Sequence, residues 1–333
     1  MQTVKLGADG PVVSVVGLGC MGMSGMYGPA DRTESIATIH AAFDAGIDLI
    51  DTGDFYGMGH NEMLIAEAIR GRPRDSYQLS VKYGAMRGPD GGWIGFDSHP
   101  KSTRNFLAYS LQRLGVDHID IYRPSRLDPA VPIEETMGAL ADLVKEGYIR
   151  HIGLSEVGAD TLRRASAVHP VVDLQIEYSL VSRGIEDTIL PVARELGIAI
   201  TAYGVLSRGL ISGHWRKESA DAGDMRRFSP RFSGNNVDTN LKLVEALAVI
   251  AQERGVTVAQ VAIAWVMAQG PDIVPIIGAR RRDRLTEALG SLNVVLDATA
   301  LAEIEKSIPR GAAAGERYAA AQMANLDSER PAA

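Results

Sequence analysis

Short apolar runs alternate with longer amphipathic runs along most of the chain. IDLI, YQLSVK and IAITAY have the length of buried strands, whereas DRTESIATIHAAFDAG and PIEETMGALADLVKEG have the spacing of helices that cover a core. Strands that are separated by helices in this way run parallel in one sheet. About eight such strand–helix units occur, so the pattern predicts an α/β protein with a (β/α)8 TIM-barrel fold.

Turn and cap residues give the boundaries of several elements. Asp9-Gly10 predicts an N-terminal β-hairpin, and Asp31 with Glu34 fits a capping box at the start of the first helix, which Gly46 ends. Residues 207–238 look irregular, and a final helix is expected from Arg281. No linker interrupts the pattern, so we expect a single barrel domain over residues 1–333, with 309–333 as a C-terminal tail.

Composition narrows the classes of function. The 333 residues are 46% hydrophobic and carry a net charge of -7, which argues against nucleic acid and anionic membranes as partners. One cysteine, Cys20, rules out a disulfide framework. No apolar run has the length of a membrane span or the pattern of a signal peptide. We therefore expect a soluble cytoplasmic enzyme or binding protein; its oligomeric state is left open.

A glycine-rich segment raises a competing fold. GLGCMG, with Gly17, Gly19 and Gly22, matches the dinucleotide-binding pattern G-x-G-x-x-G after a strand. A Rossmann fold would need a helix that opens inside this motif, but MSGMYGPAD follows and helical periodicity begins only near Thr33. The glycines are better explained as a turn between a strand and a helix.

Polar residues stand at or just past the ends of six predicted strands: Asp51, Lys82, Ser125, Ser155, Gln175 and Tyr203. The carboxyl ends of parallel barrel strands meet on one rim, where barrel enzymes have their active sites. The sequence therefore predicts one site at this rim.

Two of these residues and a tyrosine in a neighbouring loop could together transfer a proton. Tyr56 follows Asp51 in DTGDFYG, and a lysine near a tyrosine favours the phenolate, while a carboxylate keeps that lysine charged. Tyr56 would then be a general acid, Lys82 would tune it and Asp51 would anchor Lys82. The alternative is a surface tyrosine and a solvated lysine.

The motifs GIDLIDTGDFYG, LSVKYG, GLSEV, LQIEYSL, AYGVLSRGLISG and PIIGARRRDRLTEAL occur in this order between about residues 3 and 295. Together they resemble the aldo-keto reductase family, and the tail GERYAAAQMANLDSE resembles its bacterial branch. The resemblance implies a barrel that binds NADP(H) at its carboxyl rim and transfers hydride between nicotinamide and an aldehyde, ketone or alcohol. In such a protein Met23 and Trp93 would line an apolar substrate pocket.

The resemblance also implies roles for individual residues. Asp51, Tyr56 and Lys82 match three of the four catalytic residues of the family. The residues that match cofactor contacts are Asp51, Ser155 and Gln175 near the carboxamide, Tyr203 on the nicotinamide ring, Gly204, Leu206, Arg208 and Gly209 near the pyrophosphate, and Gly278, Arg280, Arg284 and Glu287 at the adenosine end. Departures from the family pattern are Glu156 and Ala288, where asparagine is common, and Gly204-Val205 in place of Ser-Pro.

The fourth catalytic residue is missing. Aligned on RLDP, the position that usually holds histidine is Ser125. Three interpretations stay open: Tyr56 suffices, with Ser125 or a water as a weak donor; His60, Arg123 or Arg126 takes over; or the site binds cofactor without reducing carbonyls. An ion pair between Arg126 and Asp128 is the expected structural use of those two residues.

The arginines at 280–284 predict a preference for NADPH over NADH, since guanidinium groups fit the oxygens of a 2'-phosphate, with Arg284 as the strongest contact. The seven histidines have no metal-binding spacing, so no metal is expected and metal-assisted hydrolysis is disfavoured. The main rival to a reductase is a regulatory barrel that senses NADPH with little turnover. Which carbonyl is reduced, and in which direction, is not encoded in recognisable motifs.

Overall fold

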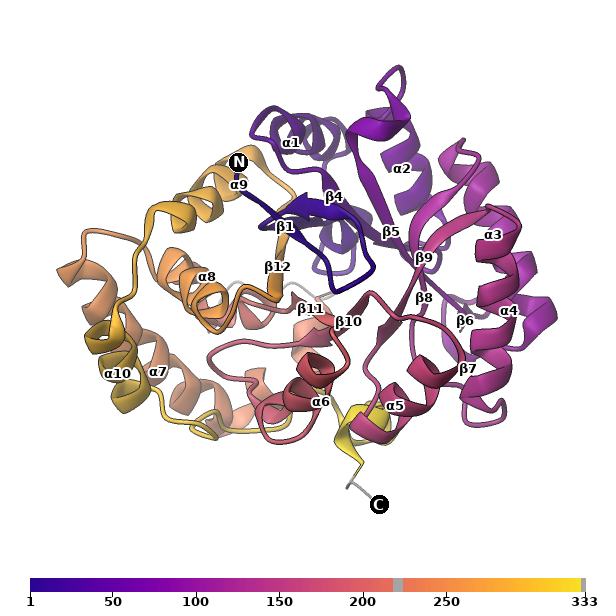
Figure 1. Ribbon diagram of the computed structural model, residues 1–333. Coiled ribbons are helices and arrows are strands. Elements are labelled where there is room, and N and C mark those ends of the chain that lie inside the picture. Colours follow the sequence, from indigo (N-terminus) through magenta and orange to yellow (C-terminus); the bar gives the residue numbers. More distant parts are fainter. Residues whose placement is uncertain (218–223, 331–333) are drawn as a thin grey trace.

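The eight predicted parallel strands close into a barrel (Figure 1). The computed structural model describes residues 1–217 and 224–330. In chain order the barrel strands are β3 (Gly17–Gly19), β4 (Leu49–Gly53), β5 (Gln78–Tyr83), β8 (Ile119–Pro124), β9 (Ile149–Ser155), β10 (Asp173–Glu177), β11 (Ala199–Tyr203) and β12 (Ile273–Gly278). Each strand pairs with its neighbours in this order, and β12 pairs with β3. The predicted (β/α)8 TIM barrel is confirmed, and no Rossmann sheet is formed by the glycine-rich segment.

Helices surround the strands in a ring (Figure 1). They are α1 (Arg32–Asp44), α2 (His60–Ala68), α3 (Pro100–Leu114), α4 (Ile133–Lys145), α5 (Ala159–Val168), α6 (Ile189–Glu195), α7 (Gly234–Glu253), α8 (Val258–Ala268) and α9 (Arg282–Leu289). The helix expected from Arg281 is α9, but the expectation that it is the final helix is wrong, because α10 (Ala298–Ser307) and α11 (Ala320–Met323) follow it. Only α11 lies in the Ala-rich tail, which has little helical periodicity of its own.

The cap of α1 forms only in part. Asp31 accepts a hydrogen bond from the backbone nitrogen of Glu34 at 2.7 Å, as expected of an N-cap. The Glu34 carboxylate does not return to Asp31; it accepts hydrogen bonds from Arg282 at the start of α9. The second half of the predicted capping box is thus replaced by a contact between two helices.

The N-terminal hairpin closes one end of the barrel. Strands β1 (Thr3–Lys5) and β2 (Val12–Ser14) pair antiparallel around the predicted turn. Leu6 and Val13 are fully buried in a cluster with Leu49, Ile121 and other residues near the amino ends of the barrel strands. The opposite end of the barrel, where the strands have their carboxyl ends, is therefore the end that remains open for a functional site. A second hairpin, of β6 (Ala85–Arg87) and β7 (Trp93–Phe96), was not foreseen.

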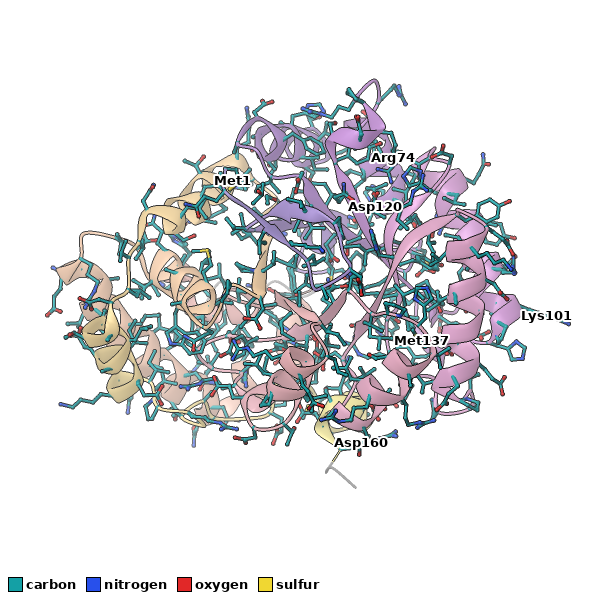
Figure 2. All side chains as sticks on the ribbon, in the orientation of Figure 1. Met1, Arg74, Lys101, Asp120, Met137 and Asp160 are labelled. Carbon is teal, nitrogen blue, oxygen red and sulfur yellow. The ribbon has the colours of Figure 1, made fainter. Side chains whose placement is uncertain are left out.

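Ion pairs also fix the strands and the loops between them. Figure 2 shows Arg74 and Asp120 close together, with Arg74 Nη2 and Asp120 Oδ2 2.5 Å apart. Asp120 also accepts a hydrogen bond from the backbone nitrogen of Leu79 on the neighbouring strand.

In the described chain no single helix is long and apolar enough to cross a membrane. Only α7 and α8 together reach that length and composition, and they are bent by 89° relative to each other.

Candidate active site

A buried network of four polar side chains lies at the carboxyl rim; we call it the floor network (Asp51, Ser80, Lys82 and Gln175). Lys82 Nζ lies 2.5 Å from Asp51 Oδ1 and 2.8 Å from Gln175 Oε1. Asp51 Oδ2 accepts from Gln175 Nε2 at 2.7 Å and from Ser80 Oγ at 2.9 Å. Strand register explains the proximity, because Asp51 pairs with Ser80 and Gly53 with Lys82 across β4 and β5.

Tyr56 stands beside this network with its hydroxyl available. Lys82 Nζ lies 5.3 Å from the centre of the Tyr56 ring, and within the described chain the Tyr56 hydroxyl makes no hydrogen bond. Burial, and then the Asp51 carboxylate, raise the pKa of Tyr56 well above its ordinary value, while the Arg126 guanidinium acts in the opposite direction. The lowered pKa that the sequence led us to expect is therefore not present. Lys82 donates to Asp51 and Gln175 and not to the phenol.

Burial also affects the lysine. It lowers the pKa of Lys82, and the Asp51 carboxylate offsets part of this effect. Both side chains are nearly inaccessible, at 6% and 5% exposure. The ammonium is held in the barrel by hydrogen bonds to two different strands, so it is a fixed charge and not a mobile surface group.

Ser125 and Arg126 follow β8 directly, as predicted. The Ser125 hydroxyl is buried and has no hydrogen-bond partner in the described chain, whereas its backbone nitrogen donates to Tyr83. The expected ion pair between Arg126 and Asp128 is wrong. Asp128 accepts from the backbone nitrogens of Ser98 and Ala130. Arg126 instead donates to the backbone oxygen of Ser125 and reaches Ser155.

A second buried network closes the rim from above; we call it the roof network (Glu156, Tyr203, Arg317, Tyr318 and Ser328). Arg317 donates to both Glu156 oxygens, at 2.8 and 2.6 Å, and the two side chains are 8% and 0% exposed. The Tyr203 hydroxyl donates to Glu156 at 2.7 Å and contacts the Tyr318 hydroxyl at 2.8 Å.

The roof network explains why Glu156 departs from asparagine. Burial alone would raise the pKa of Glu156, but the charge and hydrogen bonds of Arg317 outweigh it and hold the pKa well below the ordinary value. The backbone of Glu156 has a left-handed φ of 55°, which turns the carboxylate toward the tail. The tail also bonds to this segment through Asp327, which accepts from Gly158, and it runs close to α5 in Figure 1.

The residues predicted for the pyrophosphate form one strained loop after β11. Gly204 and Gly209 have φ of 65° and 92°, and Arg208 has φ of 57°. Arg208 donates to the backbone oxygen of Arg317 at 2.8 Å, and its guanidinium stacks 4.3 Å above the Tyr318 ring. Leu206 opens the short helix η4 (Ser207–Ser212) in the same loop.

The residues predicted for the adenosine end gather at the start of α9. Arg280 donates to the backbone oxygens of Tyr27 and Gly28, and Arg284 Nη1 lies 3.1 Å from Glu287 Oε2. A side chain placed at Gly278 would meet nothing within 4 Å, so the rim is open there. The N-cap residue Arg281 makes no side-chain bond to α9, and the backbone nitrogen of Arg282 donates to Glu34. Open space and guanidinium groups fit the phosphates of a dinucleotide.

Sequence reasoning missed Arg317 and Tyr318. They occur in the sequence ERY, in a tail that is otherwise Ala-rich, and these charged and aromatic residues were the available clue.

Within the described chain, no cluster of three or more His, Cys, Asp or Glu side chains is arranged to hold a metal ion.

Comparisons with known proteins agree with this geometry. The model of the aldo/keto reductase family matches residues 15–309. A protein of Glycine max described as probable aldo-keto reductase 1 is 42% identical over 321 residues, which cover 96% of this chain and 92% of that protein. The structure of glycerol dehydrogenase from Gluconobacter oxydans superimposes with a TM-score of 0.83 at 30% identity, over 92% of this chain and 94% of the other. The holo form of an aldo-keto reductase from Bacillus halodurans gives 0.76 at 26% identity, over 92% and 96%.

The chain belongs to the aldo/keto reductase family. It is accordingly an oxidoreductase that uses a nicotinamide cofactor and acts on small carbonyl compounds.

Proposed function

We propose that this protein is an NADPH-dependent reductase of aldehydes and ketones in which Tyr56 is the general acid. The observation that carries the proposal is the floor network: it holds a buried ammonium, Lys82, beside a tyrosine whose hydroxyl makes no hydrogen bond in the described chain. That arrangement leaves one acidic proton pointing at no protein partner and a fixed positive charge next to it.

The roles of the floor residues follow from their contacts. Asp51 accepts three hydrogen bonds, which fix Lys82 and Gln175 across the barrel. Lys82 stabilises the negative charge that Tyr56 acquires when it gives its proton to the carbonyl oxygen. When bound, NADPH supplies the hydride that the carbonyl carbon receives. Ser155 and the remaining amide hydrogen of Gln175 would orient the carboxamide, and the Tyr203 ring would lie against the nicotinamide.

The preference for NADPH rests on the basic residues near α9. Arg284 would bind the 2'-phosphate, in exchange for its present contact with Glu287, and Arg280 would line the same end. Arg284→Ala should weaken NADPH at least tenfold and NADH by less than threefold, because only NADPH carries the extra phosphate. Dissociation constants from protein fluorescence measure this. An unchanged ratio of the two constants would contradict the assignment.

The walls of the site favour an apolar substrate. The Phe55 ring lies 4.7 Å from Tyr56 and 5.7 Å from Trp93, which is 44% exposed on the second hairpin. Met23 is buried at 2% exposure and would be a deeper wall. One structural relative is a glycerol dehydrogenase, so alcohols belong in the test alongside aldehydes and ketones.

The cytoplasm is the compartment predicted for the enzyme.

The test is NADPH consumption with a panel of carbonyl compounds, and NADP+ reduction with the corresponding alcohols. Tyr56→Phe should lower turnover by about 10²–10⁴, the usual worth of a general acid, and leave NADPH affinity within threefold. Tyr109→Phe is the matched control, since Tyr109 is 56% exposed on α3. Tight NADPH binding without turnover of any compound would instead favour a regulatory barrel.

A further inference from the structure

The Arg126 guanidinium lies in the mouth of the barrel and is only partly used. Its Nη1 donates to the backbone oxygen of Ser125 at 2.6 Å and reaches Ser155 Oγ at 3.5 Å. Within the described chain its Nη2 and Nε have no hydrogen-bond partner. The side chain is partly buried, so this cation keeps two donor nitrogens that the described protein does not use.

Arg126 directly follows Ser125, the position of the missing histidine, and its Nη1 reaches Ser155, which the proposed function assigns to the nicotinamide carboxamide. Its charge acts on Tyr203, Tyr318 and Glu156 of the roof network. Its charge also acts on Tyr56, where it opposes the effects of burial and of Asp51 on the pKa. A carbonyl oxygen that receives the Tyr56 proton would therefore lie within the field of Arg126.

The other candidates for the missing histidine are already engaged. Arg123 is fully buried and forms a 3.0 Å ion pair with Asp173 inside the barrel. His60 shares a 2.9 Å hydrogen bond with Ser24 at the start of α2. Ser125 has an unpartnered hydroxyl, but that group is short and neutral.

We propose that Arg126 is a catalytic residue that donates a charge-assisted hydrogen bond to the substrate oxygen. The inference rests on the proposed function. In the reduction, the carbonyl carbon receives a hydride, the π-electron pair moves to the oxygen, and that oxygen takes the proton of Tyr56. Arg126 gives up no proton; it stabilises the negative charge on oxygen and then on the phenolate, which water reprotonates.

The first test compares Arg126→Gln, Arg126→Lys and Ser125→Ala with Arg164→Gln, a control at an exposed ion pair. With cyclohexanone, Arg126→Gln should lower kcat by about 10²–10³, as loss of one oxyanion donor does. Arg126→Lys should recover part of the rate, and Ser125→Ala should lose less than threefold. In the oxidation of cyclohexanol, Arg126→Gln should move the rise in rate to higher pH, because Tyr56 loses a stabilising charge. Arg126→Gln turnover within threefold of wild type would overturn the proposal.

The second test needs no turnover. Benzoate, an analogue of the charged oxygen, is titrated into the complex of the enzyme with NADP+ by calorimetry. Arg126→Gln should weaken benzoate at least tenfold, while Ser125→Ala and Arg164→Gln should not. If the wild type reduces no carbonyl, the proposed function fails, and this titration still decides the position of Arg126. Equal benzoate affinity in wild type and Arg126→Gln would show that Arg126 does not face the substrate oxygen.

Discussion

The floor and roof networks are both buried ion pairs at the same rim, yet they are held in different ways. Asp51 and Lys82 stand on adjacent strands, whose ladder fixes their distance. Glu156 and Arg317 are 161 residues apart, and only the docking of the tail brings them together. A broken floor pair leaves a charge that cannot reach water, because its strand cannot move. A broken roof pair can relax, because the tail can carry Arg317 outward.

The largest effect is therefore expected in the floor network. Lys82→Met leaves the Asp51 carboxylate buried without its cation, and loss of one partner of a buried pair costs about 3–5 kcal/mol. Turnover should fall by more than about 10²-fold, because Tyr56 loses the neighbouring ammonium. Urea unfolding and steady-state kinetics measure the two effects.

Lys101→Met is the control for this variant. Lys101 is exposed on α3, at the outer edge of the molecule in Figure 2. The Lys101→Met variant should leave both the unfolding free energy and the turnover unchanged. A Lys82→Met protein that unfolds within about 1 kcal/mol of wild type would show that the floor is not rigid.

Glu156→Gln should have a smaller effect, about 2–3 kcal/mol, because Arg317 keeps Glu329 at 2.7 Å and the tail can move. A protease should then cut the tail faster than in wild type, while the barrel stays intact. Glu134→Gln, at an exposed pair with Arg164, is the control. Equal cleavage rates in Glu156→Gln and wild type would mean that other contacts hold the tail.

This difference also decides what the sequence can predict. Asp51, Lys82 and Gln175 were found from sequence because each stands at or just past the end of a predicted strand, and parallel strands share one rim. In the structure the strands run on beyond these residues, to Gly53, Tyr83 and Glu177. The roof was not found, since no local pattern tells where an Ala-rich tail docks. The pairing of Arg126 failed for a similar reason. Asp128 lies close to Arg126 in the sequence, but its carboxylate accepts hydrogen bonds from the backbone nitrogens of Ser98 and Ala130.

The loop that carries Tyr56, next to the floor network, and the roof network should also respond to pH with opposite sign, which is the smallest of these effects. Burial, and then the charge of Glu62, raise the pKa of Asp54, in the loop between the floor and Tyr56, to about 7. Its folded-state pKa lies above its unfolded value, so its contribution to stability is present at low pH and is lost as pH rises toward about 7. The pKa of Glu156 is depressed, so its contribution is present at neutral pH and is lost only in acid.

Asp54→Asn separates the two responses, because asparagine cannot ionise. From about pH 5.5 to pH 8, wild type should lose about 1–2 kcal/mol of unfolding free energy that Asp54→Asn keeps. Below about pH 4 both proteins should release the tail alike, since Glu156 is unchanged. Urea unfolding at each pH measures the first effect, and protease cleavage of the tail measures the second. If Asp54→Asn and wild type lose stability in parallel up to pH 8, Asp54 is ionised in the folded protein. The loop that carries Tyr56 would then hold a second buried carboxylate, which would make Tyr56 a still weaker acid and increase its dependence on Lys82.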